Sequence, residues 1–280
     1  MILDRLQTVV KNNPQANPLY LRNLLKETLQ FYALDFVYTS SWGDPLLFKG
    51  GTCLRLCFDL PRLSEDLDFD IKNVSKFDLN LFVKDLSSYF ISKWQFRDFT
   101  YKVAGNNRQV FLQFPVLKKL NLATKNESDI LFLRLDLSPV DCKIFKEEIS
   151  LKTSYDFNFI VKRYSLEDLF ASKITAILTR TFQKGKDSKI TFKGRDYFDL
   201  IWFLQRGIKP NIPRLEKLTK KTFSAIKKDL EKNVQNINEN YLSEDLKPLF
   251  ADEKFVKTFC QNFKQLYFSL AASNVADRHT

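Results

Sequence analysis

The pattern of apolar and polar residues predicts that the first half of the chain mixes strands and helices. Apolar residues recur at helical spacing over residues 19–38, which predicts a helix. A short apolar run at residues 46–49 predicts a buried strand. Two glycines follow this run, and residues 53–58 have the pattern of a helix opening. The first recognisable unit is therefore a strand, a glycine turn and a helix.

Strict alternation of polar and apolar residues predicts further strands. Over residues 66–71, three aspartates share one face and three apolar side chains share the other. Residues 130–137 alternate in the same way. We also expect a helix over residues 77–90. Residues 96–103 and 109–117 are expected to form a hairpin around Gly105.

The second half of the chain has a helical pattern and many lysines. Ser165, with an acidic residue three positions later, resembles a capping box and predicts the start of a helix over residues 166–182. A second helix is expected over residues 195–205, ending at Gly207.

These patterns predict the fold class α+β (mixed α/β). A domain with a mixed sheet is expected at residues 1–163, and a helical domain at residues 164–280.

The composition excludes several classes of enzyme. The 280 residues include a single histidine, His279, next to the chain end. A Ser-His-Asp or Cys-His nucleophile system needs an oriented imidazole, and a histidine-rich zinc site needs several. The chemistry must therefore use carboxylates, lysines, hydroxyls or a metal held by carboxylates.

The charge and the cysteines indicate partners and compartment. Lys and Arg number 44 against 33 Asp and Glu, and the net charge of +11 implies attraction to polyanions such as nucleic acid or nucleotides. The alternative is that the charge only aids solubility. The four cysteines have no CxxC spacing, the first residues do not have the pattern expected of a secretory signal, and no apolar run approaches the roughly 20 residues that cross a bilayer. We expect a cytoplasmic protein with reduced thiols and no membrane contact.

Three aspartates are candidate metal ligands. Asp66 and Asp68 are two residues apart on a predicted strand, so their carboxylates point the same way and repel each other. A divalent cation relieves this repulsion, and Mg²⁺ binds one or two carboxylates together with substrate phosphates. Asp136 has a similar position on a separate strand. The alternative is a solvated outer face of the strand.

The glycine turn is a candidate phosphate site. Residues 49–52 read Lys-Gly-Gly-Thr and precede a helix, and unpaired amides at a helix N-terminus that is approached through glycines bind phosphate. The turn fits neither the P-loop pattern nor the dinucleotide fingerprint. The alternative is a tight connection between a strand and a helix.

The helical half contributes a lysine and two aspartates. Lys173 falls within the apolar stripe of its helix, where an ammonium needs a partner such as a triphosphate, or else extends to the rim of the stripe. Asp196 and Asp199 share one side of the start of the next helix. Either of them is a candidate general base, and the alternative is that both only interact with the helix dipole.

Taken together, these segments resemble the AbiEii/AbiGii family of nucleotidyltransferase toxins, within the DNA polymerase β-like superfamily. The resemblance rests on FKGGTCLRLCFDLPRLSEDLDFD at residues 48–70, SKITAILTR at residues 172–180 and GRDYFDL at residues 194–200. The segments occur in the order that the family has.

The resemblance implies a role for each matching residue. It implies catalytic roles for Asp66, Asp68, Lys173 and Asp196, and it implies Mg²⁺ or Mn²⁺ binding by Asp66 and Asp68. Asp136 resembles the third carboxylate of the superfamily. The residues that the resemblance and the turn assign to NTP binding are Lys49, Gly50, Gly51, Thr52, Arg62, Ser64 and Lys173.

The function implied is a Mg²⁺-dependent nucleotidyltransferase toxin of an abortive-infection type toxin–antitoxin system. It would transfer a nucleotide from an NTP to RNA, with the tRNA 3′ end as the expected acceptor and a cognate antitoxin protein as its partner. Residues 209–232 hold eight basic and three acidic side chains, which suits contact with a phosphate backbone. The alternatives are modification of a protein hydroxyl and a catalytically silent module that binds NTP or RNA. The Asp66–Asp68 pair favours catalysis over a silent module.

Overall fold

The computed structural model describes residues 1–106, 108–154, 156–179 and 193–276. The chain divides into two compact units. The first contains Met1–Val140 and Glu147–Arg163, and the second contains Asp141–Lys146 and the chain from Tyr164 onward. The short segment Asp141–Lys146 thus belongs to the second unit although the chain on both sides of it belongs to the first.

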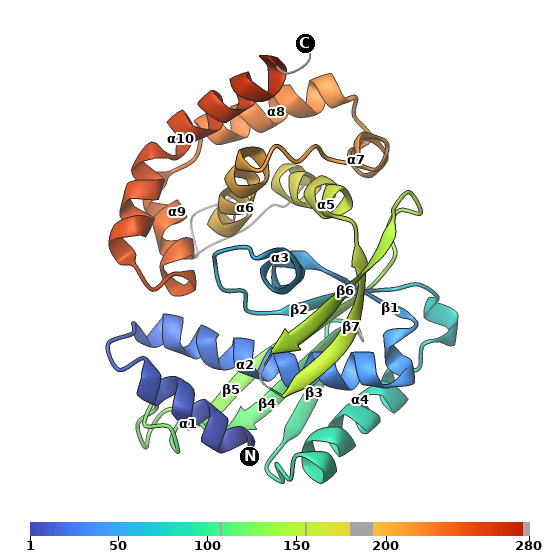
Figure 1. The fold of residues 1–280 in the computed structure, drawn as a ribbon, viewed down its shortest axis with the longest axis vertical. Coiled ribbons are helices and arrows are strands. Elements are labelled where there is room, and N and C mark those ends of the chain that lie inside the picture. Colours follow the sequence, from blue (N-terminus) through green and yellow to red (C-terminus); the bar gives the residue numbers. More distant parts are fainter. Residues whose placement is uncertain (107, 155, 180–192, 277–280) are drawn as a thin grey trace. The chain divides into compact units, whose positions relative to one another are not determined.

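A seven-stranded mixed sheet lies at the centre of the first unit (Figure 1). Its strands follow the order β3-β4-β5-β2-β1-β7-β6. β2 is antiparallel to β1 and parallel to β5, which makes the sheet mixed as predicted. The strands are β1 (Leu46–Lys49), β2 (Leu67–Ile71), β3 (Thr100–Ala104), β4 (Gln109–Pro115), β5 (Ile130–Pro139), β6 (Glu147–Ser154) and β7 (Phe157–Tyr164).

The aspartate-bearing strand β2 is an internal strand of this sheet. It pairs with β1 on one side and β5 on the other. Leu67 and Phe69 are fully buried, as the alternation predicts. The opposite face is not a freely solvated one, because Asp68 is half-buried and Asp70 is completely buried. The alternative of a solvated outer face is therefore wrong for this strand.

The helices described in the first unit are α1 (Ile2–Asn12), α2 (Pro18–Thr39), α3 (Gly50–Phe58) and α4 (Leu79–Ser88). The predicted helix at residues 77–90 corresponds to α4, which continues as a π-helical turn over Tyr89–Lys93. The helix after the glycine turn begins at Gly50, three residues earlier than the pattern predicts.

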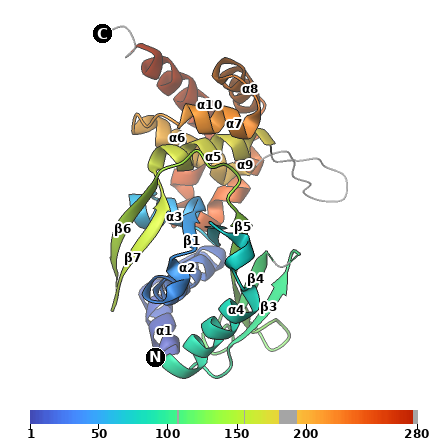
Figure 2. The ribbon, with the colours of Figure 1, turned by 90° about the vertical axis from the view of Figure 1, so that its right-hand side faces the viewer.

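Helix α2 packs against both halves of the sheet. Its start is fixed by Pro18 in the first turn and by the side chain of Asn17, which accepts a hydrogen bond from the amide of Leu19. Figure 2 shows α2 between the β6–β7 hairpin and the β3–β4 hairpin. Stacked rings join it to β7, with centroids 6.5 Å apart for Phe31 and Phe157. This aromatic packing forms much of the core of the first unit.

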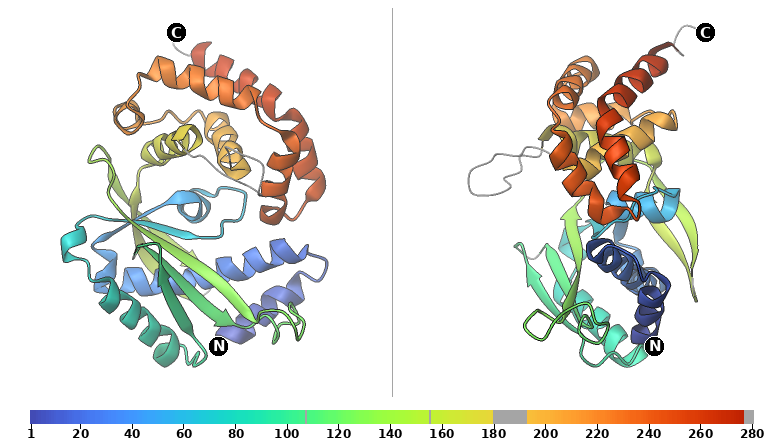
Figure 3. Two further views of the ribbon diagram at one scale, coloured as in Figure 1. Left: turned by 180° about the vertical axis from the view of Figure 1, so that it is seen from behind. Right: turned by 90° about the vertical axis from the view of Figure 1, so that its left-hand side faces the viewer.

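The opposite face of β3, β4 and β5 is open. Seen from behind, these strands lie in front of α2 and α4, and no described helix of the first unit crosses them (Figure 3, left). Lys102 is exposed on this side, and Phe132 is 42 % exposed. Side chains that alternate with the buried leucines of β5 therefore face solvent or an external ligand.

The second unit contains the helices α5 (Leu166–Thr179), α6 (Gly194–Gln205), α7 (Ile212–Thr219), α8 (Phe223–Gln235), α9 (Glu239–Leu246) and α10 (Glu253–Ala276). Helix α6 packs against α5, α9 and α10. Phe203 of α6 stacks on Phe170 of α5 with ring centroids 4.3 Å apart. The helical second half is therefore confirmed, as is the end of α6 before Gly207, whose φ is +64°.

A buried arginine attaches the segment Asp141–Lys146 to the helices of the second unit. Arg214 of α7 is 1 % exposed and donates hydrogen bonds to the carbonyls of Cys142 and Ile144 and to the carboxylate of Asp141. Half of the predicted capping box is present: the amide of Asp168 donates to the hydroxyl of Ser165, whereas the amide of Ser165 donates to the carbonyl of Lys146. Arg214 lies within the basic stretch at residues 209–232, and its burial means that it is not available to a nucleic acid.

Some expectations fall on parts of the chain that the structure does not describe. Residues 180–182 at the end of the predicted helix, including Arg180 of the family motif, lie outside the described residues, and so does His279. Among the described helices, none is both long enough and apolar enough to cross a membrane.

Candidate active site

The glycine turn joins β1 to α3 against the carboxylate of Asp68. Gly50 has a φ of +79°, a conformation that residues with a Cβ rarely adopt. A Cβ at Gly50 would overlap Oδ2 of Asp68 and lie 2.8 Å from its Cγ. Both the backbone angle and the close approach therefore require glycine at this position.

The second glycine is in contact with two other predicted site residues. A Cβ at Gly51 would lie 2.8 Å from both Nη2 of Arg62 and Oγ of Ser64. Arg62 is 1 % exposed, and its guanidinium donates to the carbonyl of Leu63. The hydroxyl of Thr52 is buried and donates to the carbonyl of Asp66. These side chains therefore stabilise the turn, which leaves the amides of the turn as its candidate phosphate ligands.

The start of α3 has the character of an anion site. Lys49 is its N-cap residue in an extended conformation, and its side chain makes no capping hydrogen bond. The first amides of a helix lack partners within the helix and attract anions. The ammonium of Lys49 lies 2.5 Å from the buried Asp70. The structure thus gives Lys49 a partner on β2 that the sequence does not predict.

Three predicted aspartates and one unpredicted arginine form what we call the sheet cluster: Asp66, Asp68, Asp136 and Arg134. In the register of β2 and β5, Asp68 is directly opposite Asp136. Nη2 of Arg134 lies 2.6 Å from Oδ2 of Asp66 and 3.0 Å from Oδ2 of Asp136. The structure therefore places the three carboxylates that the sequence assigns to metal binding in one region of the first unit, although not close enough together to form a metal site as they stand.

Arg134 is a functional candidate that the sequence patterns do not identify. The only available signal was its position two residues before Asp136 on an alternating strand, which places both on the same face. Alternation reports the face of a strand and says nothing about partners across it. The contact with Asp66 follows from the pairing of β2 with β5.

The donor set of the sheet cluster fits a divalent cation. Carboxylate oxygens are the ligands that Mg²⁺ and Mn²⁺ prefer in proteins. Asp66 and Asp136 already share one cationic group, and Asp68 makes no hydrogen bond or ion pair with any residue that the structure describes. No three ligating side chains in the described part of the chain are placed together closely enough to hold a metal as they stand. Metal binding at the sheet cluster therefore requires its carboxylates to move closer together.

The predicted residues of the second unit form what we call the helix cluster: Lys173, Asp196 and Asp199. The ammonium of Lys173 lies 2.9 Å from Oδ1 of Asp196 and 2.6 Å from Oδ2 of Asp199. The side chain of Lys173 is 13 % exposed, and those of the two aspartates are 3 % and 0 % exposed. Lys173 therefore has its partners inside the protein, and the alternative that its ammonium extends to the rim of the stripe is wrong.

Burial and neighbouring groups shift the pKa values of side chains beside Asp196 and on α3. Burial raises the pKa of Tyr197 above its ordinary value, and the neighbouring charge of Asp196 raises it further. On α3, burial raises the pKa of the Cys53 thiol well above its usual range. The pKa of Cys57 is lowered, first by its hydrogen bond with Cys53 and further by the positive charge of Arg163. All four cysteines are free thiols, as the sequence predicts.

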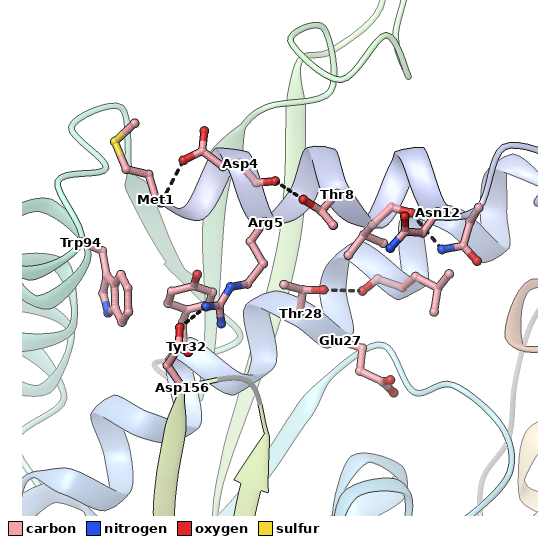
Figure 4. Close-up of a pocket in the computed structure, with 13 residues that line it drawn as sticks. Met1, Asp4, Arg5, Thr8, Asn12, Glu27, Thr28, Tyr32, Trp94 and Asp156 are labelled. Carbon is pink, nitrogen blue, oxygen red and sulfur yellow. Dashed lines mark hydrogen bonds and ion pairs between the residues drawn. The ribbon is translucent and has the colours of Figure 1, made fainter.

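A separate cavity of about 600 Å³ lies beside α1 and α2 in the first unit. Figure 4 shows the residues that line it, which include Arg5, Tyr32, Trp94 and Asp156. The guanidinium of Arg5 donates to Asp156 and lies 5.7 Å from the ring centroid of Tyr32. None of the predicted site residues lines this cavity, so it is not the predicted nucleotide site.

Comparison with known proteins identifies the class and the family. The fold is similar to the crystal structure of JHP933 from Helicobacter pylori, with a TM-score of 0.52 and 19 % sequence identity. The match covers 92 % of this chain and 95 % of that chain. It also matches MenT4, a nucleotidyltransferase toxin from Mycobacterium tuberculosis H37Rv, over 95 % and 97 % of the two chains, with a TM-score of 0.52 and 16 % identity. No curated protein sequence matched the chain.

The fold and the family profile define this protein as a nucleotidyltransferase. The profile of the nucleotidyl transferase AbiEii toxin of type IV toxin–antitoxin systems matches residues 34–264. The chain therefore belongs to the AbiEii toxin family, which confirms the resemblance drawn from its motifs.

Proposed function

We propose that this toxin transfers a nucleotide from a Mg²⁺-bound NTP to the 3′ end of tRNA. The observation that carries the proposal is the sheet cluster. Asp68 and Asp136 are opposite each other on β2 and β5, Asp66 directly precedes β2, and Asp68 lies against a glycine turn that opens a helix. In this reaction the acceptor hydroxyl attacks the α-phosphate, the bond to the β-phosphate breaks, and pyrophosphate leaves.

The residues of the first unit have distinct roles in the proposal. Asp66, Asp68 and Asp136 would hold the divalent cation, which supplies charge neutralisation at the phosphates when bound. The amides of Gly50 and Gly51 would bind phosphate oxygens. The turn would be supported by three buried side chains, those of Thr52, Arg62 and Ser64.

The second unit would contribute Lys173 as a ligand of the triphosphate. Asp196 and Asp199 then hold the ammonium in one position, because both carboxylates lie within 3 Å of it. We also propose that the exposed lysines of residues 209–232 contact the acceptor, and that a cognate antitoxin protein restrains the enzyme. These roles make residues 164–280 the part of the chain that completes the active site.

A transfer assay tests the proposal. The full chain is incubated with Mg²⁺, total tRNA and each of the four NTPs labelled at the α-phosphate. We expect label on tRNA with the wild type and its loss in Asp68→Asn. The matched control is Asp59→Asn, which makes the same chemical change at an exposed residue with a φ of +60°, where asparagine is well accepted.

Each other outcome of the assay counts against the proposal in a defined way. Label on protein in place of tRNA would favour modification of a protein hydroxyl. Tight NTP binding by folded protein without transfer to any acceptor would favour a silent module. An Asp68→Asn variant that transfers label like the wild type would remove the sheet cluster from the chemistry.

A further inference from the structure

Arg134 occupies the position between two carboxylates that the proposed function assigns to a cation. Its Nη2 is within 3.0 Å of one oxygen on Asp66 and one on Asp136. A guanidinium nitrogen and a divalent cation attract the same carboxylate oxygens. Both cannot lie between Asp66 and Asp136 at the same time, because each needs those oxygens at bonding distance.

Arg134 can leave this position without rearrangement of the core. Its side chain is 31 % exposed and lies on the face of β5 that alternates with the buried leucines. The preceding residue on the same face, Phe132, is 42 % exposed, so there is open space on that side. The Nε of Arg134 is buried and has no acceptor among the described residues, so the guanidinium is only partly satisfied where it lies.

We propose that Arg134 is an internal counter-ion that neutralises the sheet cluster in the absence of metal and is displaced when a divalent cation binds. It is a positioning residue that sets the affinity of the site for the cation. The inference rests on the proposed function, since it takes Asp66 and Asp136 as the metal ligands. It makes cation binding an exchange of one positive group for another, so the apparent affinity is lowered by the cost of displacing Arg134.

Binding of Mn²⁺ to the full chain without NTP tests the exchange. The measurement is calorimetry, or electron paramagnetic resonance of free Mn²⁺, at constant ionic strength. We expect Arg134→Gln to bind Mn²⁺ about tenfold more tightly than the wild type, because the guanidinium no longer competes for the oxygens of Asp66 and Asp136. Arg134→Lys should restore weak binding, because an ammonium competes as well. A thermal denaturation of each variant establishes that it is folded.

The matched control is Lys102→Gln, which removes the same charge from the same face of the sheet. The register pairs Lys102 with Phe111 and Phe111 with Arg134, so Lys102 lies two strands from Arg134. Its removal should leave Mn²⁺ affinity within about twofold of the wild type, because exposed charges at this separation are largely screened.

The possible failures are distinguishable. If folded Arg134→Gln binds Mn²⁺ no more tightly than the wild type, the exchange is wrong, and the transfer assay still decides the proposed function on its own. If neither wild type nor Arg134→Gln binds Mn²⁺ and the wild type transfers no label, both the exchange and the proposed function are wrong.

Discussion

Each unit of this protein places one cationic side chain between two aspartates, and the two arrangements differ in burial. In the sheet cluster, the side chains paired with Arg134 are 20 % and 21 % exposed, and Arg134 itself is 31 % exposed. In the helix cluster, no side chain is more than 13 % exposed. Partly exposed pairs exchange their partners at little cost, whereas a buried charge that loses its partner is strongly destabilising.

The difference indicates that the two clusters have different roles. The sheet cluster can release its arginine to admit a cation, and it retains a third carboxylate, Asp68, that has no partner among the described residues. The helix cluster is a fixed assembly whose charges stabilise one another. A ligand that binds Lys173 must therefore do so while Asp196 and Asp199 remain paired with its ammonium.

The largest expected effect is on stability, from Lys173→Met. The substitution removes the ammonium that lies within 3 Å of both buried carboxylates, so we expect the free energy of unfolding to fall by about 3–5 kcal/mol. Urea denaturation of the full chain measures this loss. Lys102→Met, at an exposed lysine, is the control and should change stability by less than about 0.5 kcal/mol. A loss below about 1 kcal/mol for Lys173→Met would remove the contrast between the clusters.

Gly50→Ala should abolish nucleotide transfer and lower stability. The new Cβ would overlap the carboxylate of Asp68, so this carboxylate must move, and the positive φ costs a further ~1–2 kcal/mol. Gly207→Ala is the matched control, because Gly207 also has a positive φ and its new methyl group would meet nothing within 4 Å. Transfer assays and thermal denaturation compare the two variants. Equal losses of stability with activity retained in both would show that the contact with Asp68 is unimportant.

Arg134→Gln should cost little stability, in contrast to Lys173→Met. Because its ion pairs are partly exposed, we expect a loss of less than about 1 kcal/mol, and the loss should shrink as salt is added. Denaturation at low and high ionic strength without divalent cations measures both effects. A loss of about 3 kcal/mol or more that does not respond to salt would make Arg134 as structural as Lys173.

The smallest effect is expected from single lysines of the second unit. Lys228→Gln, at an exposed lysine of α8, should weaken tRNA binding only a few-fold and reduce the salt dependence of the affinity by about one counterion. Filter binding at several salt concentrations measures this. Lys254→Gln, at an exposed lysine outside residues 209–232, is the control. Equal effects of both substitutions would mean that the basic stretch is not a specific acceptor surface.

The parts of the fold that depend on local pattern could be predicted from the sequence. The strand at residues 46–49, the glycine turn and the alternating strand after it all follow from the spacing of apolar residues and from the scarcity of glycine in the chain. The pairing of strands could not be predicted in this way. The contact of Arg134 with Asp66 depends on β2 lying beside β5, and nothing in either segment specifies its neighbour.

The partners of the site residues were harder to predict than their positions. Lys173 and Asp199 were both identified, yet the ion pair between them depends on how two helices pack. Likewise, Thr52 and Arg62 have the right chemistry for phosphate, but the structure uses their side chains inside the turn. A polar residue in a motif can bind a ligand or support the chain that binds it, and only the three-dimensional contacts separate these roles.

The most direct test of nucleotide transfer compares NTPs labelled at different phosphates. The wild-type chain is incubated with Mg²⁺ and tRNA, with ³²P at either the α- or the γ-phosphate, and the 3′ end of the tRNA is analysed. We expect label at that end from the α-phosphate only, because pyrophosphate carries the γ-phosphate away. Label from the γ-phosphate, or none from any of the four NTPs with folded protein, would contradict it.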